Sequence, residues 1–170
     1  MTARRRLIFM RHAKAETFAE TDHERELTER GRRDAVAAGM YLASIGVLPG
    51  YVLVSSAARA VGTWEAVAHG AGAHPVVSLD DAIYGGGPEV VTDVLRAVPV
   101  EAEVVMVVGH NPTVASCVHL LDDGNGDDAA LREMALGYPT SALTVFEVEV
   151  PWSDLDADAG TVTHFHVARG

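Results

Sequence analysis

Two arginines and two histidines in this sequence are of the types that could bind and transfer a phosphoryl group. They are Arg11 and His12, which are adjacent, Arg59, and His110, which follows a glycine. A neutral imidazole nitrogen can attack phosphorus and hold the phosphoryl group covalently, and an unperturbed pKa of about 6.5 leaves most imidazole neutral near pH 7. Nearby arginines lower that pKa further, and their planar guanidinium groups match phosphate oxygens.

Each of these side chains lies just beyond a short apolar run that predicts a buried strand. The runs cover residues 7–10, 51–54 and 104–108, and their length is typical of strands that are buried on both faces. Because segments with helical character lie between the runs, we expect a mostly parallel sheet. Ligands of such sheets bind outside the carboxyl ends of the strands. The four side chains should therefore meet at one edge of the sheet.

The remaining elements extend this α/β pattern. Thr28 fits the N-cap position of a helix, and Pro88 and Pro112 each fit the first turn of another. We expect helices over residues 28–44, 59–69, 88–97 and 112–121, and further strands over 76–77, 142–149 and 161–167. The last two strands alternate polar and apolar residues, which predicts antiparallel additions at a sheet edge. Residues 13–27 predict a polar loop over the site, and residues 122–128 a mobile acidic loop whose role does not follow from the sequence.

The composition is that of one globular domain. The chain has 170 residues, of which 48% are hydrophobic and 22% charged, so we expect a single domain over 1–170. A single cysteine, Cys117, excludes an internal disulfide framework. The sequence has no recognisable secretory signal, and the run 104–108 is far too short to span a bilayer. We expect a cytoplasmic protein with no membrane partner, and the oligomeric state does not follow from the sequence.

The charge is unevenly distributed, which limits the partners. The net charge is −11, and nine of the 13 Lys and Arg residues lie within residues 1–33. Beyond that segment only four arginines remain, Arg59, Arg96, Arg132 and Arg169. Four scattered arginines cannot form a broad basic face, so we expect no nucleic-acid binding. An acidic surface also repels small polyanions, so a local arginine cluster would have to capture a phosphorylated ligand.

Four motifs in this order resemble the histidine phosphatase superfamily, also called phosphoglycerate-mutase-like. They lie at residues 7–14, 25–31, 55–59 and 108–112, and the pattern is most similar to the SixA-like phosphohistidine phosphatases. The family's Arg-His-Gly motif is present with alanine at position 13. The resemblance implies a three-layer α/β/α fold with a mostly parallel central sheet.

The resemblance also implies roles for individual residues. His12 is expected to be the nucleophile that becomes phosphohistidine, while Arg11, Arg59 and His110 bind the phosphoryl group and stabilise its transition-state charge. Arg25 is expected to be an additional substrate-binding residue near the pocket. No metal and no cofactor are implied. These roles fit a reaction that depends mostly on positioning and electrostatics.

The identity of a general acid stays open. Residues 79–85 resemble a mutase-like segment in which a glutamate donates the proton, and Asp81 takes that position with a side chain one methylene shorter. Asp80 is an alternative, and a solvated acidic turn with no catalytic role is a third possibility.

The sequence favours a phosphatase acting through phospho-His12, with a phosphohistidine on another protein as substrate. The chain passes from Arg59 to Asp81 without an insertion that could form a lid. In addition, imidazole leaves more readily than an alkoxide, so an uncertain acid favours phosphohistidine. The alternatives are a small-molecule phosphomonoesterase of the same superfamily and a non-catalytic phosphate-binding domain. The physiological substrate does not follow from the sequence.

Overall fold

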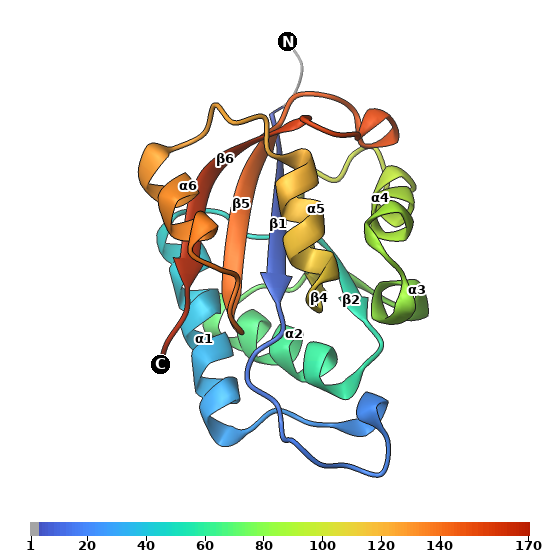
Figure 1. Ribbon diagram of the computed structural model, residues 1–170, viewed down its shortest axis with the longest axis vertical. Coiled ribbons are helices and arrows are strands. Elements are labelled where there is room, and N and C mark those ends of the chain that lie inside the picture. Colours follow the sequence, from blue (N-terminus) through green and yellow to red (C-terminus); the bar gives the residue numbers. More distant parts are fainter. Residues whose placement is uncertain (1–3) are drawn as a thin grey trace.

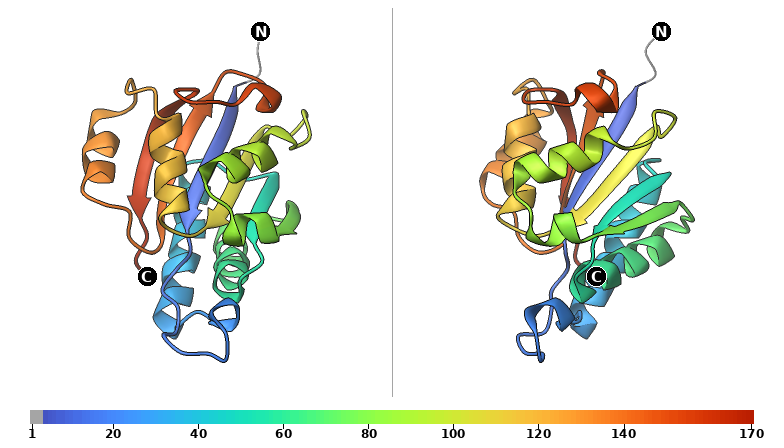
Figure 2. Two further views of the ribbon diagram at one scale, coloured as in Figure 1. Left: turned by 45° about the vertical axis from the view of Figure 1, so that its right-hand side comes forward. Right: turned by 90° about the vertical axis from the view of Figure 1, so that its right-hand side faces the viewer.

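In the computed structural model, which describes residues 4–170, one six-stranded sheet is flanked by helices on both faces (Figures 1 and 2). The strands are β1 (Arg5–Arg11), β2 (Tyr51–Ser55), β3 (Val76–Asp80), β4 (Val104–Gly109), β5 (Ala142–Val148) and β6 (Gly160–Val167). The helices are α1 (Glu29–Ser44), α2 (Ala58–Ala71), α3 (Asp81–Gly85), α4 (Pro88–Arg96), α5 (Thr113–Leu121) and α6 (Asp128–Ala135), with 3-10 turns η1 (Asp22–Glu24) and η2 (Trp152–Asp154). This architecture confirms the expected three-layer α/β/α fold.

The strand order is β3-β2-β4-β1-β5-β6. The first four of these strands run parallel, and β5 and β6 add antiparallel strands at one edge, as expected. The register pairs Arg11 with Gly109 and Ser55 with Asp80, so the carboxyl ends of all four parallel strands lie at the same end of the sheet. That end is at the bottom of Figure 1, where the chain between β1 and α1 projects beyond the sheet.

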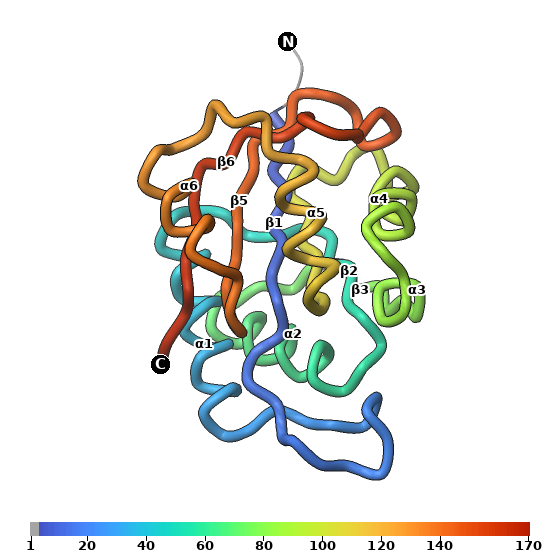
Figure 3. The backbone as a smooth tube through the Cα atoms, in the orientation of Figure 1, coloured from blue at the N-terminus to red at the C-terminus, as the bar shows by residue number. Residues whose placement is uncertain are grey.

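Each strand in the middle of the sheet is buried on both faces because helices cover both. Leu7 and Phe9 of β1 pack into the core under α4, α5 and α6, whereas Ile8 and Met10 pack into the core under α1 and α2. All four side chains are almost completely buried. The tube in Figure 3 follows β1 through the middle of the fold to its end among the loops. The packing of β1 in the core therefore fixes the position of the residues that follow this strand.

Several predicted elements differ from the structure. The sequence predicts a loop over residues 122–128 and no helix after it, whereas residues 128–135 form the helix α6. Asp127 caps this helix by accepting a hydrogen bond from the Ala130 N–H at 2.8 Å. The acidic turn around Asp81 is the short helix α3. The alternation expected in β5 is absent, because this strand lies inside the sheet between β1 and β6 and is buried along most of its length.

Within residues 4–170, no helix combines the length and apolar character needed to cross a membrane.

Candidate active site

His12 follows β1 directly and is held by backbone hydrogen bonds. Its N–H donates to the Gly109 carbonyl at 2.9 Å, which extends the pairing of β1 with β4 beyond the strand ends. The ring Nδ1 lies 2.7 Å from the Ala13 carbonyl oxygen. Because a carbonyl can only accept, Nδ1 carries the proton in the neutral ring, and the lone pair of Nε2 is left as the nucleophilic site.

Ala13 connects the His12 segment to α2. Its N–H donates to the Thr63 hydroxyl at 2.9 Å, and that hydroxyl donates to the Arg59 carbonyl at 2.6 Å. Ala13 is fully buried, and it is not among the residues with positive φ. An alanine can therefore replace the glycine of the family motif without backbone strain. The Ala13 carbonyl orients the His12 ring, and the hydrogen bonds through Thr63 fix Ala13 relative to α2, the helix that carries Arg59.

Two arginines lie beside His12, and each is anchored through one part of its guanidinium group. Arg11 donates from Nη1 to the Tyr138 carbonyl at 3.0 Å. Arg59, at the start of α2 and only 6% exposed, donates from Nη1 to the Asp22 carbonyl at 2.9 Å and from Nη2 to the Asp22 carboxylate at 3.1 Å. In both arginines the Nε atom is buried and has no hydrogen-bond partner among residues 4–170.

His110 follows β4 and faces His12, with ring centroids 5.2 Å apart. Its Nε2 lies 2.6 Å from the Ser55 hydroxyl. Its Nδ1 is buried, and no residue in the described part of the chain pairs with it. Gly109 lets α5 pack closely on the end of β4, because an added Cβ would lie 3.1 Å from a methyl group of Val114.

Both histidines are held in the neutral state. The pKa of His12 is lowered to about 4, chiefly by burial and also by the positive charges of Arg59, Arg11 and Arg25, while the hydrogen bond to the Ala13 carbonyl acts in the opposite direction. The pKa of His110 is likewise lowered to about 3, chiefly by burial and also by the charges of His12 and Arg59. A neutral His12 is the form that can attack phosphorus.

The loop over residues 13–27 lies over this site, as expected from the sequence. Its base is closed by a bridge between Ala15 and Leu27, and by the Thr28 N–H, which donates to the Lys14 carbonyl at 3.0 Å. Gly31 lets α1 pack directly on this base, because a Cβ there would come within 2.1 Å of the Lys14 carbonyl oxygen. These contacts hold the two ends of the loop together, where it leaves β1 and where it enters α1.

Within that loop, the Asp22 carboxylate gathers three donors. Arg25 binds one oxygen from Nε at 3.0 Å and Nη2 at 2.9 Å. Tyr84 of α3 donates its hydroxyl to the other oxygen at 2.8 Å, beside the Nη2 of Arg59. The hydrogen bond from Tyr84 is the main reason that the pKa of Asp22 falls to about 2, with Arg25 and Arg59 adding to it. The structure thus brings Arg25 to the same cluster as Arg59.

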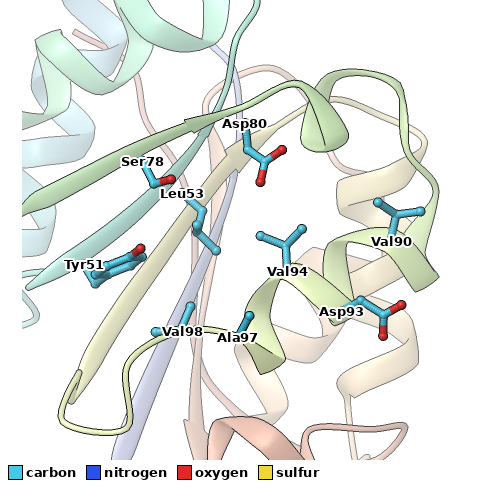
Figure 4. A pocket seen from close by; sticks show the side chains of 9 residues that line it. All are labelled: Tyr51, Leu53, Ser78, Asp80, Val90, Asp93, Val94, Ala97 and Val98. Atoms are coloured by element: carbon cyan, nitrogen blue, oxygen red, sulfur yellow. The ribbon is translucent and has the colours of Figure 1, made fainter.

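The two candidate acids lie in different surroundings. The Asp81 carboxylate accepts a hydrogen bond from the Ser56 hydroxyl, which in turn lies 2.9 Å from Nε2 of His23. Asp80 instead caps α3, accepting from the Ala82 N–H at 2.8 Å. Asp80, but not His12, lines a cavity of about 450 Å³ between β2 and α4. Figure 4 shows the Asp80 carboxylate facing this cavity. Asp80 therefore serves as a helix cap, whereas Asp81 joins the Ser56–His23 network.

Some residues of the site were not found by sequence reasoning. Asp22 and Tyr84 had no assigned role, since Asp22 is one of several acids in an irregular polar stretch. Tyr138 contributes its backbone carbonyl, which accepts hydrogen bonds from Arg11 and, at 2.8 Å, from the Asn111 side-chain amide. Because any residue type has a backbone carbonyl, the sequence does not identify such a contact.

Among residues 4–170, no group of three or more His, Cys, Asp or Glu side chains is arranged to hold a metal ion.

The amino-acid sequence of this chain is similar to those of one protein family. The model of the histidine phosphatase superfamily (branch 1) matches residues 7–83. A Mycobacterium tuberculosis protein of uncharacterised function is 34% identical over 162 residues, covering 94% of this chain and 100% of the relative. A Mycobacterium leprae protein, also uncharacterised, is 32% identical over 166 residues, with 94% and 100% coverage.

Solved structures agree with the sequence comparison. A Nakamurella multipartitia protein proposed to be the phosphohistidine phosphatase SixA superposes with a TM-score of 0.84 at 32% identity, covering 97% of this chain and 96% of that one. A similarly described Agrobacterium tumefaciens protein gives 0.79 at 27% identity, with 95% and 97% coverage. A mycobacterial glucosyl-3-phosphoglycerate phosphatase shares the fold at 18% identity and a TM-score of 0.61, with 98% and 99% coverage. This chain belongs to the histidine phosphatase superfamily.

Proposed function

We propose that this protein is a phosphatase that transfers a phosphoryl group to Nε2 of His12 and then hydrolyses the phosphohistidine, with a phosphohistidine side chain of another protein as its substrate. One observation carries the proposal. A neutral His12, with its proton on Nδ1, lies beside three buried nitrogen atoms that have no partner in residues 4–170: Nε of Arg11, Nε of Arg59 and Nδ1 of His110. Buried polar atoms are nearly always paired, so three of them beside one nucleophile make a fitting receptor for phosphoryl oxygens.

The proposed reaction has two displacement steps. In the first, the Nε2 lone pair of His12 forms a bond to phosphorus while the bond from phosphorus to the substrate nitrogen breaks, and the substrate leaves as neutral imidazole. In the second, water attacks the phosphoryl group on His12, releasing inorganic phosphate and a proton. Arg11, Arg59 and His110 stabilise the charge on the equatorial oxygens in both steps. We propose that these donors suffice without a metal ion.

The leaving group and the course of the chain support a protein substrate. A phosphohistidine whose other ring nitrogen is protonated leaves as neutral imidazole, which requires no strong acid, whereas an alkoxide does. The segment from Arg59 to Asp81 contains only α2, β3 and their connection, so it contributes no lid that would restrict the site to a small molecule. The structural relatives proposed to be SixA phosphatases point to the same substrate class. We propose further that the domain expected over 1–170 carries the whole activity, since the described strands form one sheet.

A substrate panel tests the proposal. Purified protein should release phosphate from a phosphohistidine-bearing protein domain far faster than from sugar phosphates, nucleotides or p-nitrophenyl phosphate. Brief reaction followed by alkaline quenching should trap an acid-labile phosphoryl group on His12. Faster turnover of an ester would instead support a small-molecule phosphomonoesterase. Binding of a phosphorylated ligand without turnover or labelling would indicate a non-catalytic domain.

A further inference from the structure

The two neighbouring serines at the end of β2 contact two different histidines. Ser55 is completely buried, and its hydroxyl lies 2.6 Å from Nε2 of His110. Ser56 is half-buried and contacts His23 and Asp81. The difference follows from the end of the strand: Ser55 is still paired with β3, opposite Asp80, while Ser56 is the first residue beyond β2. The environment of Ser55 is therefore set by the sheet.

The hydrogen-bonding capacity of Ser55 determines the direction of its bond to His110. Its oxygen already accepts from the Ala57 N–H at 3.3 Å, in a serine turn that leads into α2. The hydroxyl has one proton to donate, and His110 Nε2 is the acceptor found for it among residues 4–170. If Nε2 carried a proton instead, the buried Ser55 proton would have no acceptor among residues 4–170.

We propose that Ser55 is a positioning residue that fixes the tautomer of His110, keeping the ring proton on Nδ1, where it can be donated to the phosphoryl group. This inference rests on the proposed function for its catalytic consequence, although the tautomer itself does not. A neutral ring donates a hydrogen bond without adding a further full positive charge beside Arg59 and His12. Burial of His110 favours the same neutral state. Ser55 thereby fixes the tautomer of His110, as the Ala13 carbonyl fixes that of His12. The results are opposite: within residues 4–170, His12 has an unpaired Nε2 lone pair, and His110 has an unpaired Nδ1–H.

Nitrogen NMR tests the tautomer without relying on turnover. In the wild-type protein near pH 7, long-range ¹H–¹⁵N correlations should show His110 with a protonated Nδ1 and an unprotonated Nε2, the signals being assigned by their loss in His110→Asn. Ser55→Ala should shift this ring toward the Nε2–H form. Ser56→Ala, the same change one residue away, should leave the His110 tautomer unchanged. A wild-type ring protonated on Nε2, or an unchanged tautomer in Ser55→Ala, would overturn the proposal.

Activity then tests the consequence. Ser55→Ala should lower kcat and weaken vanadate binding by about tenfold at most, the scale of one buried hydrogen bond, and Ser55→Thr should restore part of both. Thr92→Val is the matched control, because it also removes one buried hydroxyl, which donates to Pro88 in α4; its kcat should equal that of wild type. If Ser55→Ala changes the tautomer but not kcat or vanadate binding, the positioning role fails. If wild type hydrolyses no substrate while its tautomer is as proposed, the proposed function fails and the tautomer assignment stands.

Discussion

The floor of the candidate site and its rim are built in different ways. We call Arg11, His12, Arg59 and His110 the floor, and Asp22, Arg25, Tyr84 and Asp81 the rim. Floor residues end a strand, follow one or lie in the first turn of a helix, and backbone hydrogen bonds such as that from His12 to Gly109 fix their positions. Rim residues lie in the 13–27 loop or on α3 and are held by hydrogen bonds of exposed side chains.

This difference has an energetic consequence. The ion pair of Arg25 with Asp22 joins side chains that are 26% and 55% exposed, and exposed pairs contribute only about 0–1 kcal/mol. The rim can therefore rearrange when a phosphoryl group arrives, whereas moving the floor would require breaking the sheet. We expect floor substitutions to affect every substrate and rim substitutions to have effects that depend on the ligand.

The largest effect is expected at His12. His12→Ala should reduce turnover by at least about 10⁴-fold, because the proposed covalent intermediate forms on this ring, and losses of this size are typical of nucleophile removal. The far-ultraviolet circular dichroism spectrum should stay that of wild type, since the side chain lies beyond the end of β1. Phosphoryl label trapped on another residue would contradict the assignment.

The next largest effect is expected at Arg59. Arg59→Ala should slow every substrate by about 10²–10³-fold, the cost of removing one preorganised donor from developing charge. Arg132→Ala, which removes an exposed arginine of α6, should leave kcat unchanged. A loss that differs strongly between phosphohistidine and phosphate esters would mean that Arg59 contacts the leaving group and not the phosphoryl oxygens.

The same division explains what the sequence could predict. Apolar runs locate strands, and a parallel sheet brings their carboxyl ends together, so the convergence of Arg11, His12, Arg59 and His110 followed from local patterns. The contacts of Asp22 with Tyr84 join residues 62 positions apart, and no periodicity encodes such a pair. The helix α6 was missed because the acidic, glycine-rich residues before it dominated the interpretation, although Asp127 is a good N-cap.

A smaller, substrate-dependent effect is expected at Asp81. Asp81→Asn should slow an alkyl phosphate by roughly 10²-fold, the general-acid scale, and should slow phosphohistidine hydrolysis far less because imidazole leaves readily. The measurement is the ratio of the two rate losses in one protein preparation. Equal losses, or none, would show that Asp81 does not protonate the leaving group and that its contact with Ser56 is structural.

At Asp22 the expected change is modest and favourable for binding. Its carboxylate shares Arg59 with the proposed phosphoryl site and adds negative charge beside it. Asp22→Asn keeps an oxygen acceptor for Tyr84 and Arg25 but removes the charge, so vanadate should bind up to about fivefold more tightly, the scale of one exposed ion pair. Asp156→Asn, which changes an exposed carboxylate near η2, should have no effect. Weaker vanadate binding in Asp22→Asn would mean that the carboxylate is needed to hold Arg59 in place.

The smallest effect is expected from pH between 5 and 8. Because burial and the neighbouring arginines lower the pKa of His12 to about 4, an NMR titration should show its ring still neutral at pH 5.5, where an unperturbed histidine with a pKa of about 6.5 is mostly protonated. The unfolded chain then binds more protons than the folded one between about pH 6.5 and 4. The corresponding stability is fully present above pH 6.5 and is lost as pH falls through 4. His12→Asn, which cannot titrate, should lose less stability over that interval in urea unfolding. An equal loss in both proteins, or a His12 midpoint near 6.5, would mean that the floor does not hold this ring neutral.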